Sequence, residues 1–231
     1  TFAVWVKPGL SKYDVNGVNR HSGILSFADM ITEDYVHDIY FTSQIRLGCN
    51  DVWFEFVVEH GDFTMNFNTT SATVSQHKWT HVVATMDNSG GALYGVLYVD
   101  GNFKNNQEVP NYELLPVMNR NRNFCGRSAV NSLHWEGTIS SLQIWDRALD
   151  DSEVMNLYNE SYGKYIYNNQ IQHELLFYKN NLTDNIGNMD VSFVNCNYSL
   201  GEGIVFDGID DYMTLDSVEL GGPMTIALWA R

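Results

Sequence analysis

Three carboxylates lie close together in the stretch Asp207-Gly-Ile-Asp-Asp211. Carboxylates this near in sequence repel one another unless they are solvated, paired with cations or bridged by a hard metal ion. Carboxylate oxygens on a glycine-containing turn are ligands that Ca²⁺ accepts in proteins. Asp207, Asp210 and Asp211 are therefore a candidate structural calcium site, and the alternative interpretation is an acidic surface turn.

Four Asn-x-Ser/Thr sequons provide a second chemical signal. The acceptor residues are Asn68, Asn159, Asn181 and Asn197. N-linked glycans attach at this motif in secreted proteins. Together the four sequons predict a secreted or cell-surface glycoprotein.

The three cysteines, Cys49, Cys125 and Cys196, have no zinc-binding spacing. In an oxidising compartment they predict one disulfide with one cysteine left over. Their spacing does not choose among the three pairings.

Residues that could perform catalysis are not arranged for it in the sequence. Asp51, Glu55 and Glu59 share one face of a predicted strand, but residues four apart on a strand are about 13 Å apart, too far to flank one glycosidic bond. The sequence contains no Gly-x-Ser-x-Gly, no His-Glu-x-x-His and no phosphate-binding loop. His81 lies within a predicted strand, where we expect a packed or surface residue rather than a base. We therefore predict that the chain is not an enzyme.

The composition limits the possible partners. The 231 residues carry a formal net charge of -15, which argues against nucleic acid and anionic membranes as partners. Apolar residues make up 44% of the chain and aromatic residues 13%, enough for a large packed core. No apolar run approaches the 18 residues or so of a membrane-spanning helix.

Most of the chain is predicted to form strands. Val-, Phe- and Tyr-rich segments alternate between two faces and are separated by glycine- and asparagine-rich turns. Asp150 or Asp151 can cap one short helix, with Val154, Leu157 and Tyr158 on a single face. The clearest predicted strands are Thr1–Lys7, Gly23–Ala28, His37–Leu47, Asp51–His60, Phe63–Asn68, Trp79–Asp87 and Ala92–Val99.

One strand sequence occurs twice. Thr1-Phe-Ala-Val-Trp-Val-Lys7 and Thr225-Ile-Ala-Leu-Trp-Ala-Arg231 share Thr, Ala and Trp, and their other four positions are exchanged for similar residues. A repeat of this kind predicts one period of a tandem array, cut inside a strand.

Several short motifs follow one another along the chain, among them Trp79–Asp87, Leu97–Gly101 and Gly137–Tyr158. Their order resembles the laminin-G-like jelly rolls of the concanavalin A-like lectin and glucanase superfamily. The resemblance implies an all-β fold, a two-sheet antiparallel jelly-roll sandwich with one short helix near residue 150. It also implies structural calcium in some members, near the region of Asp207. The closing motif departs from the family pattern, because Ser140 and Ser141 stand where an acidic residue is usual. The segments that carry the resemblance are Thr1–Pro8, Trp79–Asp87, Leu97–Gly101, Cys125–Ser128, Gly137–Tyr158 and Gly203–Leu215.

The resemblance also implies an unusual domain organisation. Residues 1–160 resemble the C-terminal two-thirds of a jelly roll, and residues 173–231 resemble the N-terminal third of the next one, or of the same one in permuted order. Residues 161–172 are the expected linker. The tail is expected either to complete its own sandwich or to enter that of a neighbour.

Two functional interpretations follow. The first is a non-enzymatic structural repeat of a surface or filamentous glycoprotein, in which neighbouring copies of the repeat are the main partners. The alternative is a lectin-like adhesion module that binds a glycan or an extracellular protein. A lectin-like module needs exposed aromatic rings beside polar groups on a concave face or loop rim.

Overall fold

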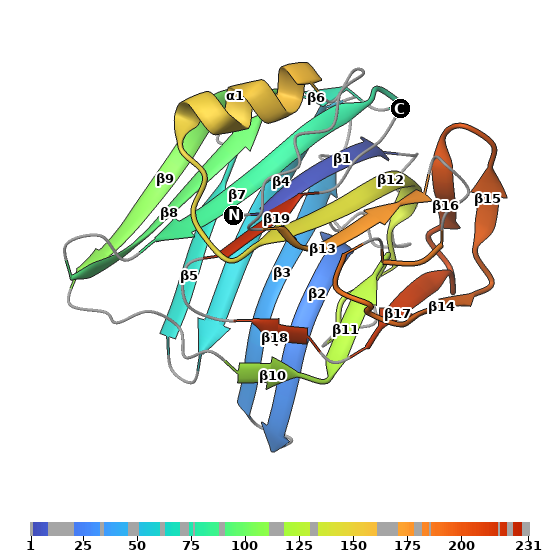
Figure 1. Cartoon of the computed structure of the whole chain (residues 1–231), viewed down its shortest axis with the longest axis horizontal. Helices are drawn as coiled ribbons and strands as arrows, with labels where there is room; N and C mark the ends of the chain where they lie inside the picture. The colour runs from blue at the N-terminus through green and yellow to red at the C-terminus, as the bar shows by residue number, and fades with distance from the viewer. Residues whose placement is uncertain are drawn as a thin grey trace.

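The strands of this protein form two facing antiparallel sheets, as the computed structural model shows (Figure 1). In sheet A the strand order is β15 (Asn197–Ser199), β16 (Gly203–Asp207), β12 (Glu136–Trp145), β1 (Phe2–Pro8), β7 (Thr80–Asp87), β8 (Ala92–Val99) and β9 (Asn102–Pro110). Two further strands of sheet A, β13 (Ile171–Leu176) and β19 (Met224–Ala227), pair with β12. The structure describes residues 2–8, 21–32, 35–45, 51–60, 63–69, 74–75, 77–87, 91–110, 118–129, 134–160, 171–177, 182–184, 186–216, 218–220 and 224–227.

Sheet B covers the opposite side of the core. Its order is β14 (Val191–Val194), β17 (Tyr212–Leu215), β11 (Arg122–Cys125), β2 (His21–Thr32), β3 (Tyr35–Ile45), β4 (Asp51–His60) and β5 (Phe63–Asn68), with β6 (Val74–Ser75) beside β4. A small ladder joins β10 (Met118–Arg120) to β18 (Val218–Leu220). Every described strand pair is antiparallel, and the predicted all-β jelly-roll sandwich is confirmed.

The alternation predicted for Asp51–His60 places side chains in the core. Phe54, Phe56 and Val58 are fully buried on one face of β4, because successive side chains of a strand point to opposite faces. They join one large apolar cluster that both sheets contribute to, including Leu25 of β2 and Leu142 of β12. The next strand, β5, pairs antiparallel with β4, with His60 opposite Phe63.

A tight turn joins β8 to β9. Asp100 and Gly101 both have positive φ angles, of 51° and 74°, which a two-residue hairpin turn of this type requires and which glycine adopts without steric cost. Asp100 also ties this turn to β7: the backbone N–H of His81 donates to Asp100 Oδ1 at 2.9 Å, and the Asp100 N–H donates to the His81 carbonyl at 2.8 Å.

The predicted helix forms as α1 (Asp151–Glu160) and packs on the outer face of sheet A (Figure 1). Val154 and Leu157 of α1 are buried in a second apolar cluster with Val83 and Val96 of the sheet. The cluster follows from the 3.6-residue period of the helix, which places these two side chains on one face.

Strands from the C-terminal part of the sequence pair with strands from its N-terminal part. In sheet A, β13, β16 and β19 pair with β12, and in sheet B, β17 pairs with β11. The consecutive strands β16 and β17 therefore lie in different sheets. Phe206 of β16 packs directly against Gly126 beyond β11, where a Cβ atom would lie 2.3 Å from its ring. Residues 161–170, the larger part of the predicted linker, lie outside the described residues, and the predicted boundaries of the two parts stay a prediction.

Candidate functional site

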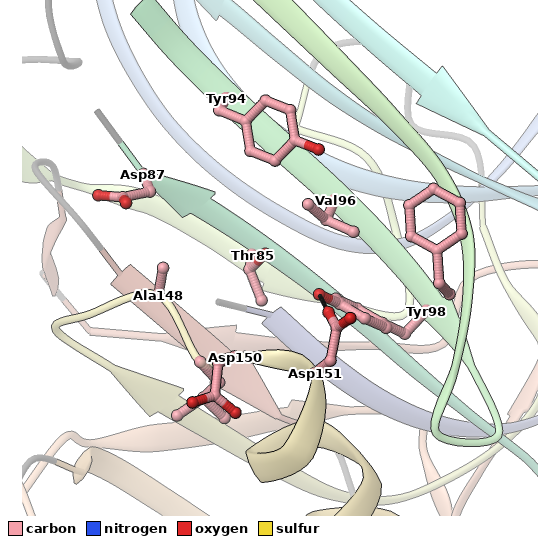
Figure 2. Close-up of a pocket in the computed structure, with 10 residues that line it drawn as sticks. Thr85, Asp87, Tyr94, Val96, Tyr98, Ala148, Asp150 and Asp151 are labelled. Atoms are coloured by element: carbon pink, nitrogen blue, oxygen red, sulfur yellow. Dashed lines mark hydrogen bonds between the residues drawn. The ribbon is translucent and has the colours of Figure 1, made fainter. Parts of the chain in front are cut away.

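A groove of about 390 Å³ opens on the outer face of sheet A, beside the start of α1 (Figure 2). Strands β7, β8 and β9 form its floor, and the segment that leads into α1 forms one wall. The groove is lined by Thr85, Asp87, Tyr94, Val96, Tyr98, Phe103, Ala148, Leu149, Asp150 and Asp151.

The start of α1 is fixed by a capping arrangement that also shapes the groove. Asp150 Oδ1 accepts a hydrogen bond from the Glu153 backbone N–H at 2.9 Å, and Glu153 Oε2 accepts one from the Asp150 N–H at 3.0 Å. Arg147 then holds Glu153 through both carboxylate oxygens, at 2.6 and 2.7 Å. The hydroxyl of Ser152 and the Glu153 N–H lower the pKa of Asp150, so this carboxylate stays ionised at neutral pH.

One hydrogen bond joins the helix to the floor of the groove. The Tyr98 hydroxyl donates to Asp151 Oδ1 at 2.7 Å. Tyr98 is almost fully buried, and burial, followed by this hydrogen bond to Asp151, raises the pKa of the phenol well above its usual range. The phenol is therefore a neutral donor at every ordinary pH, which keeps the wall and the floor of the groove at a fixed separation.

The exposed surface of the groove combines aromatic rings with carboxylates. Phe103 is 53% exposed, and Tyr94 is half-buried and accepts a hydrogen bond from the Asn106 side-chain amide. Asp87 and Asp150 also line the groove. None of the described lining residues is basic. An aromatic ring can cover the apolar face of a sugar while carboxylates accept hydrogen bonds from its hydroxyls, so the groove suits a neutral polyhydroxylated ligand.

This groove was not predicted from the sequence. The signal that could have found it is the spacing of Tyr94, Val96 and Tyr98, which alternate along β8 and therefore share the face that the helix partly covers. The missing information was how α1 packs on the sheet, which places Asp150 and Asp151 beside that face.

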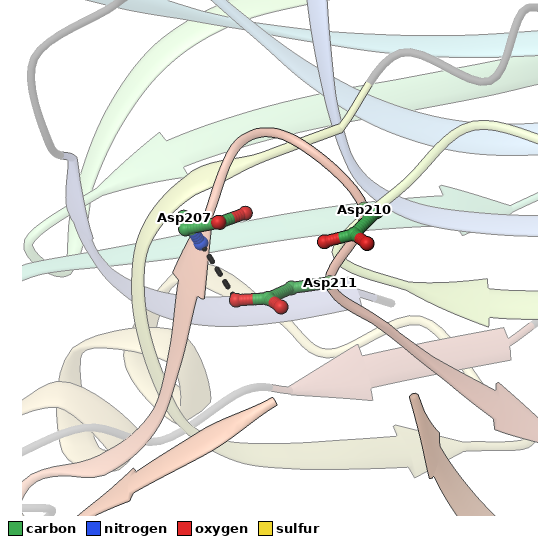
Figure 3. A group of neighbouring side chains, drawn as sticks. All are labelled: Asp207, Asp210 and Asp211. Atoms are coloured by element: carbon green, nitrogen blue, oxygen red, sulfur yellow. Dashed lines mark hydrogen bonds between the residues drawn. The ribbon is translucent and has the colours of Figure 1, made fainter. Parts of the chain in front are cut away.

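The structure brings together the three predicted calcium ligands in the loop between β16 and β17 (Figure 3). One oxygen from each of Asp207, Asp210 and Asp211 lies within 4.8 Å of the others. Two ligands of one Ca²⁺ ion, each 2.3–2.6 Å from it, lie at most about 5 Å apart, so the spacing fits a shared ion.

Hydrogen bonds position each of these carboxylates through one oxygen. Asp211 Oδ2 accepts from the Asp207 N–H at 2.9 Å, Asp207 Oδ1 from the Ile209 N–H at 2.7 Å, and Asp210 Oδ2 from the Asn195 amide at 2.8 Å. Burial, together with the like charges of Asp207 and Asp210, raises the pKa of Asp211. A bound cation would offset this repulsion, so the donor set fits the predicted ion in type and in spacing.

Three of the predicted glycosylation sites, Asn68, Asn159 and Asn197, lie on different elements of the structure. Asn159 is exposed on α1 and Asn197 is exposed on β15, whereas Asn68 is half-buried at the end of β5. Asn181 lies outside the described residues. The two exposed asparagines are accessible to a glycosyltransferase in the folded state.

His81 and the acidic residues of β4 were also considered from the sequence as possible chemical groups. His81 is fully buried, its ring stacks on that of Tyr158 with centroids 5.9 Å apart, and burial lowers its pKa to about 3. The imidazole is therefore neutral and packed, as expected. The side chains of Asp51, Glu55 and Glu59 lie outside the description.

Comparison with known proteins agrees with the architecture. The fold defines a lectin-like jelly-roll protein, a class whose members are mainly binding modules. The family model described as the concanavalin A-like lectin/glucanases superfamily, of laminin-G type, matches residues 1–155, and the chain belongs to this superfamily. No curated protein matches the chain, and no solved structure does. Among the described residues, no helix has the length and hydropathy needed to cross a membrane.

Proposed function

We propose that this chain is a non-enzymatic extracellular structural module of a repetitive surface or filamentous glycoprotein, whose copies join through their jelly-roll sandwiches. The observation that supports this proposal is that both copies of the duplicated strand sequence are directed to one position in sheet A. Both β1 and β19 pair with β12 on one side and with β7 on the other.

The two strands also use the same register. Ile144 of β12 is the partner of Phe2 and of Ile226, and Gln143 is the partner of Ala3 and of Ala227. The contact of β19 with β7, Met224 opposite Met86, continues the register in which Phe2 lies opposite Ala84. Equivalent residues of the two copies therefore recognise the same backbone positions.

One position between two strands accommodates one complete strand. A full-length β1 and a full-length second copy compete for β12 and β7, so one of them is available to the sandwich of another copy. Strand addition of this kind supplies main-chain hydrogen bonds and buries apolar side chains. The donor strand and the acceptor position are different surfaces of the chain, so a contact between two copies would be heterologous and could propagate into a filament.

Engineered disulfides test this proposal. Cross-strand neighbours have Cα atoms about 4.5–5.5 Å apart, which suits a disulfide. We expect Ile144→Cys combined with Ile226→Cys to give a ladder of covalent oligomers on a non-reducing gel. Ile144→Cys with Phe2→Cys is the matched control: it traps the copies in which the chain's own β1 fills the position, and it should therefore give linked monomers and no ladder. Linked monomers alone in the first variant, at micromolar concentration, would contradict assembly through this strand.

A fragment provides an independent test. Residues 1–160 lack β13 to β19 and leave the edges of β12 and β11 without partners. We expect this fragment to be poorly soluble and residues 173–231 to rescue it when added separately. If residues 1–160 form a stable, soluble monomer, this fragment folds without β13 to β19.

The second candidate function is that of a lectin-like glycan-binding module, and the groove beside α1 favours it. Phe103 and Tyr94 meet the requirement for aromatic rings beside polar groups. Titration with methyl glycosides of glucose, galactose and N-acetylglucosamine should then shift the NMR signals of β8 and β9, and Phe103→Ala should abolish those shifts. Leu200→Ala, at an apolar residue that is 86% exposed on the β15–β16 turn, is the control. No shift with any glycoside would exclude this group of ligands.

The extracellular location is part of the same proposal. Its supports are the exposed sequons at Asn159 and Asn197 and the calcium-compatible geometry of Asp207, Asp210 and Asp211. When bound, the ion would supply positive charge between β16 and β17, which belong to different sheets. N-linked glycans would keep the outer surface of α1 and of β15 hydrated.

A further inference from the structure

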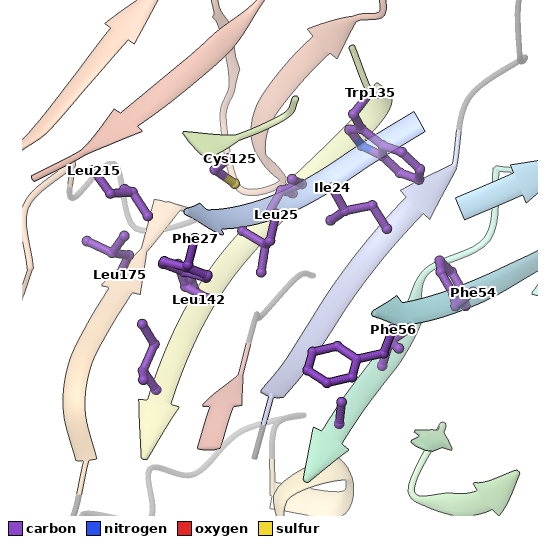
Figure 4. Packing of buried hydrophobic residues seen from close by; sticks show 14 of the residues in the cluster. Ile24, Leu25, Phe27, Phe54, Phe56, Cys125, Trp135, Leu142, Leu175 and Leu215 are labelled. Carbon is purple, nitrogen blue, oxygen red and sulfur yellow. The ribbon is translucent and has the colours of Figure 1, made fainter. Parts of the chain in front are cut away.

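Cys125 lies at the end of β11, on the face of sheet B that points into the sandwich. It is fully buried in the main apolar cluster, near Leu25 and Leu215 (Figure 4). Its Cα register partner on the neighbouring strand is Met213 of β17. The Cys125 thiol therefore lies beside the stretch of β17 that begins at Tyr212.

Cys196 approaches the same stretch of β17 from its β14 flank, because β17 lies between β14 and β11 in sheet B. It lies between β14 and β15, where the chain passes from sheet B to sheet A. Its Sγ atom lies 3.2 Å from the carbonyl oxygen of Tyr212 and 3.3 Å from that of Val194. Cys196 is half-buried and packs against the cluster that contains Cys125. Tyr212 directly precedes Met213, so the two thiols converge on adjacent residues of one strand.

We propose that Cys125 and Cys196 are the disulfide pair of this protein and that Cys49 is the cysteine left over. Both thiols are free in the structure, and this inference concerns the oxidised protein in the extracellular location proposed above. A bond here would join β11 to the crossover between the sheets. It would tie the part of the chain that matches the family model to the segment that supplies β14 to β17.

The reaction is thiol–disulfide exchange with a small disulfide such as glutathione disulfide. The Cys196 thiolate attacks that disulfide, which forms a mixed disulfide and releases one glutathione. The Cys125 thiolate then attacks the Cys196 sulfur, which forms the protein disulfide and releases a second glutathione. Two protein thiols are oxidised, one glutathione disulfide is reduced to two thiols, and each thiol proton of the protein is lost as its thiolate forms.

Burial determines when this reaction can occur. Burial raises the pKa of the Cys125 thiol well above its usual range and that of Cys196 to about 11, so both are protonated in the folded state. The thiolate is the reactive form, and Cys125 is inaccessible once the sandwich has closed. Oxidation should therefore proceed during folding and be slow in the reduced native protein.

Refolding followed by peptide mapping tests the pairing. The reduced, unfolded full chain is refolded in a mixture of glutathione and glutathione disulfide, free thiols are alkylated, and peptides are analysed by mass spectrometry without reduction. We expect one cross-linked peptide pair containing Cys125 and Cys196, a mass lower by two hydrogens, and alkylation at Cys49. Cys49→Ser should leave this cross-link unchanged, and Cys125→Ser should abolish it.

Thermal unfolding provides a second measurement on the same samples. The cross-link encloses a long loop, so the oxidised Cys49→Ser protein should melt about 5–15 °C above its reduced form. A cross-link from Cys49 to either other cysteine in the refolded wild-type chain would overturn the assignment. Three alkylated thiols after refolding in the oxidising mixture would overturn it equally, and neither result bears on whether β19 joins a neighbouring copy.

Discussion

The Tyr98 hydroxyl donates a hydrogen bond of 2.7 Å to Asp151, and this bond joins β8 to the first turn of α1. The pair lies at the inner end of the groove, where the sheet and the helix meet (Figure 2). Loss of this hydrogen bond should lower stability whether the face has a structural role or binds a ligand.

Tyr98→Phe should lower the free energy of unfolding by about 1–2 kcal/mol, because a partly buried hydrogen bond to a carboxylate is lost. Urea unfolding followed by tryptophan fluorescence measures the change. Tyr94→Phe removes a hydroxyl that bonds only the amide of Asn106 near the surface, and it should cost less. If the two variants lose the same free energy of unfolding, the hydrogen bond to Asp151 contributes no more than the one to Asn106, which would contradict the prediction.

Asp184 should make the protein sensitive to acid. Its carboxylate is fully buried and accepts hydrogen bonds from His173 Nδ1 at 2.6 Å and from the N–H groups of Glu174, Ile186 and Met189 at 3.0–3.1 Å. Burial raises the pKa of this carboxyl, but the four donors outweigh burial and hold the pKa well below its usual range.

A carboxyl with a lowered folded-state pKa stabilises the fold above its unfolded pKa of about 4 and loses that contribution as the pH falls. Asp184→Asn should cost about 2–3 kcal/mol at pH 7 and flatten the stability curve below about pH 4. Urea midpoints measured from pH 7 to pH 2 test this. An unchanged slope in the variant would show that Asp184 is not responsible.

His81 should weaken the fold at higher pH values than Asp184 does. Its folded-state pKa is about 3, against 6.5 for an ordinary histidine. Between these values the unfolded chain binds a proton that the folded chain does not, so stability falls by roughly 1 kcal/mol per pH unit as the pH decreases from about 6.5. His81→Phe should remove this slope between pH 6 and pH 4. A variant with the wild-type slope in that range would contradict the prediction.

Calcium should raise the melting temperature if Asp207, Asp210 and Asp211 bind it. Extracellular sites have dissociation constants of about 10⁻⁴–10⁻³ M, so about 2 mM Ca²⁺ should add roughly 1 kcal/mol, or about 2–4 °C. Asp210→Asn should abolish the increase, whereas Asp190→Asn, at an exposed residue outside the loop, should retain it. Equal melting with Ca²⁺ and with chelator would leave these residues as an acidic turn.

Glycosylation should be observed when the chain passes through a secretory pathway. Enzymatic deglycosylation should lower the mass of the secreted protein, with occupied sites at Asn159 and Asn197, which are exposed. Asn159→Gln and Asn197→Gln should each remove one glycan, and mapping of glycopeptides should also cover Asn68 and Asn181. If all four asparagines are bare, the prediction of a secreted glycoprotein loses its main support.

Local patterns in the sequence were sufficient to predict the helix and seven of the strands, β1 to β5, β7 and β8. The alternation of Phe54, Phe56 and Val58 predicted both β4 and its buried face, because a strand has a period of two residues. Asp150 or Asp151 was predicted to cap the start of α1, and Asp150 is the residue whose side chain does so. These elements depend on neighbours in sequence, which a single chain displays directly.

Relationships between distant segments could not be predicted in this way. Ser140 and Ser141 replace the acidic residue of the family pattern, and both are fully buried in β12. A buried carboxylate lies close by, but it comes from Glu174 of β13, which accepts a hydrogen bond from Gln143 Nε2 at 2.7 Å. The groove depends in the same way on how α1 packs against β8, which no local period encodes.

The passage from β16 to β17 changes sheets within the loop Gly208–Asp211. A force that separates the two sheets would therefore be carried partly along the covalent backbone of this short loop. The neighbouring ladders would be opened one hydrogen bond at a time, whereas the loop would have to be extended as a whole. In a filament under tension, this loop and the passage from β14 to β15 would therefore share the load that passes between the sheets.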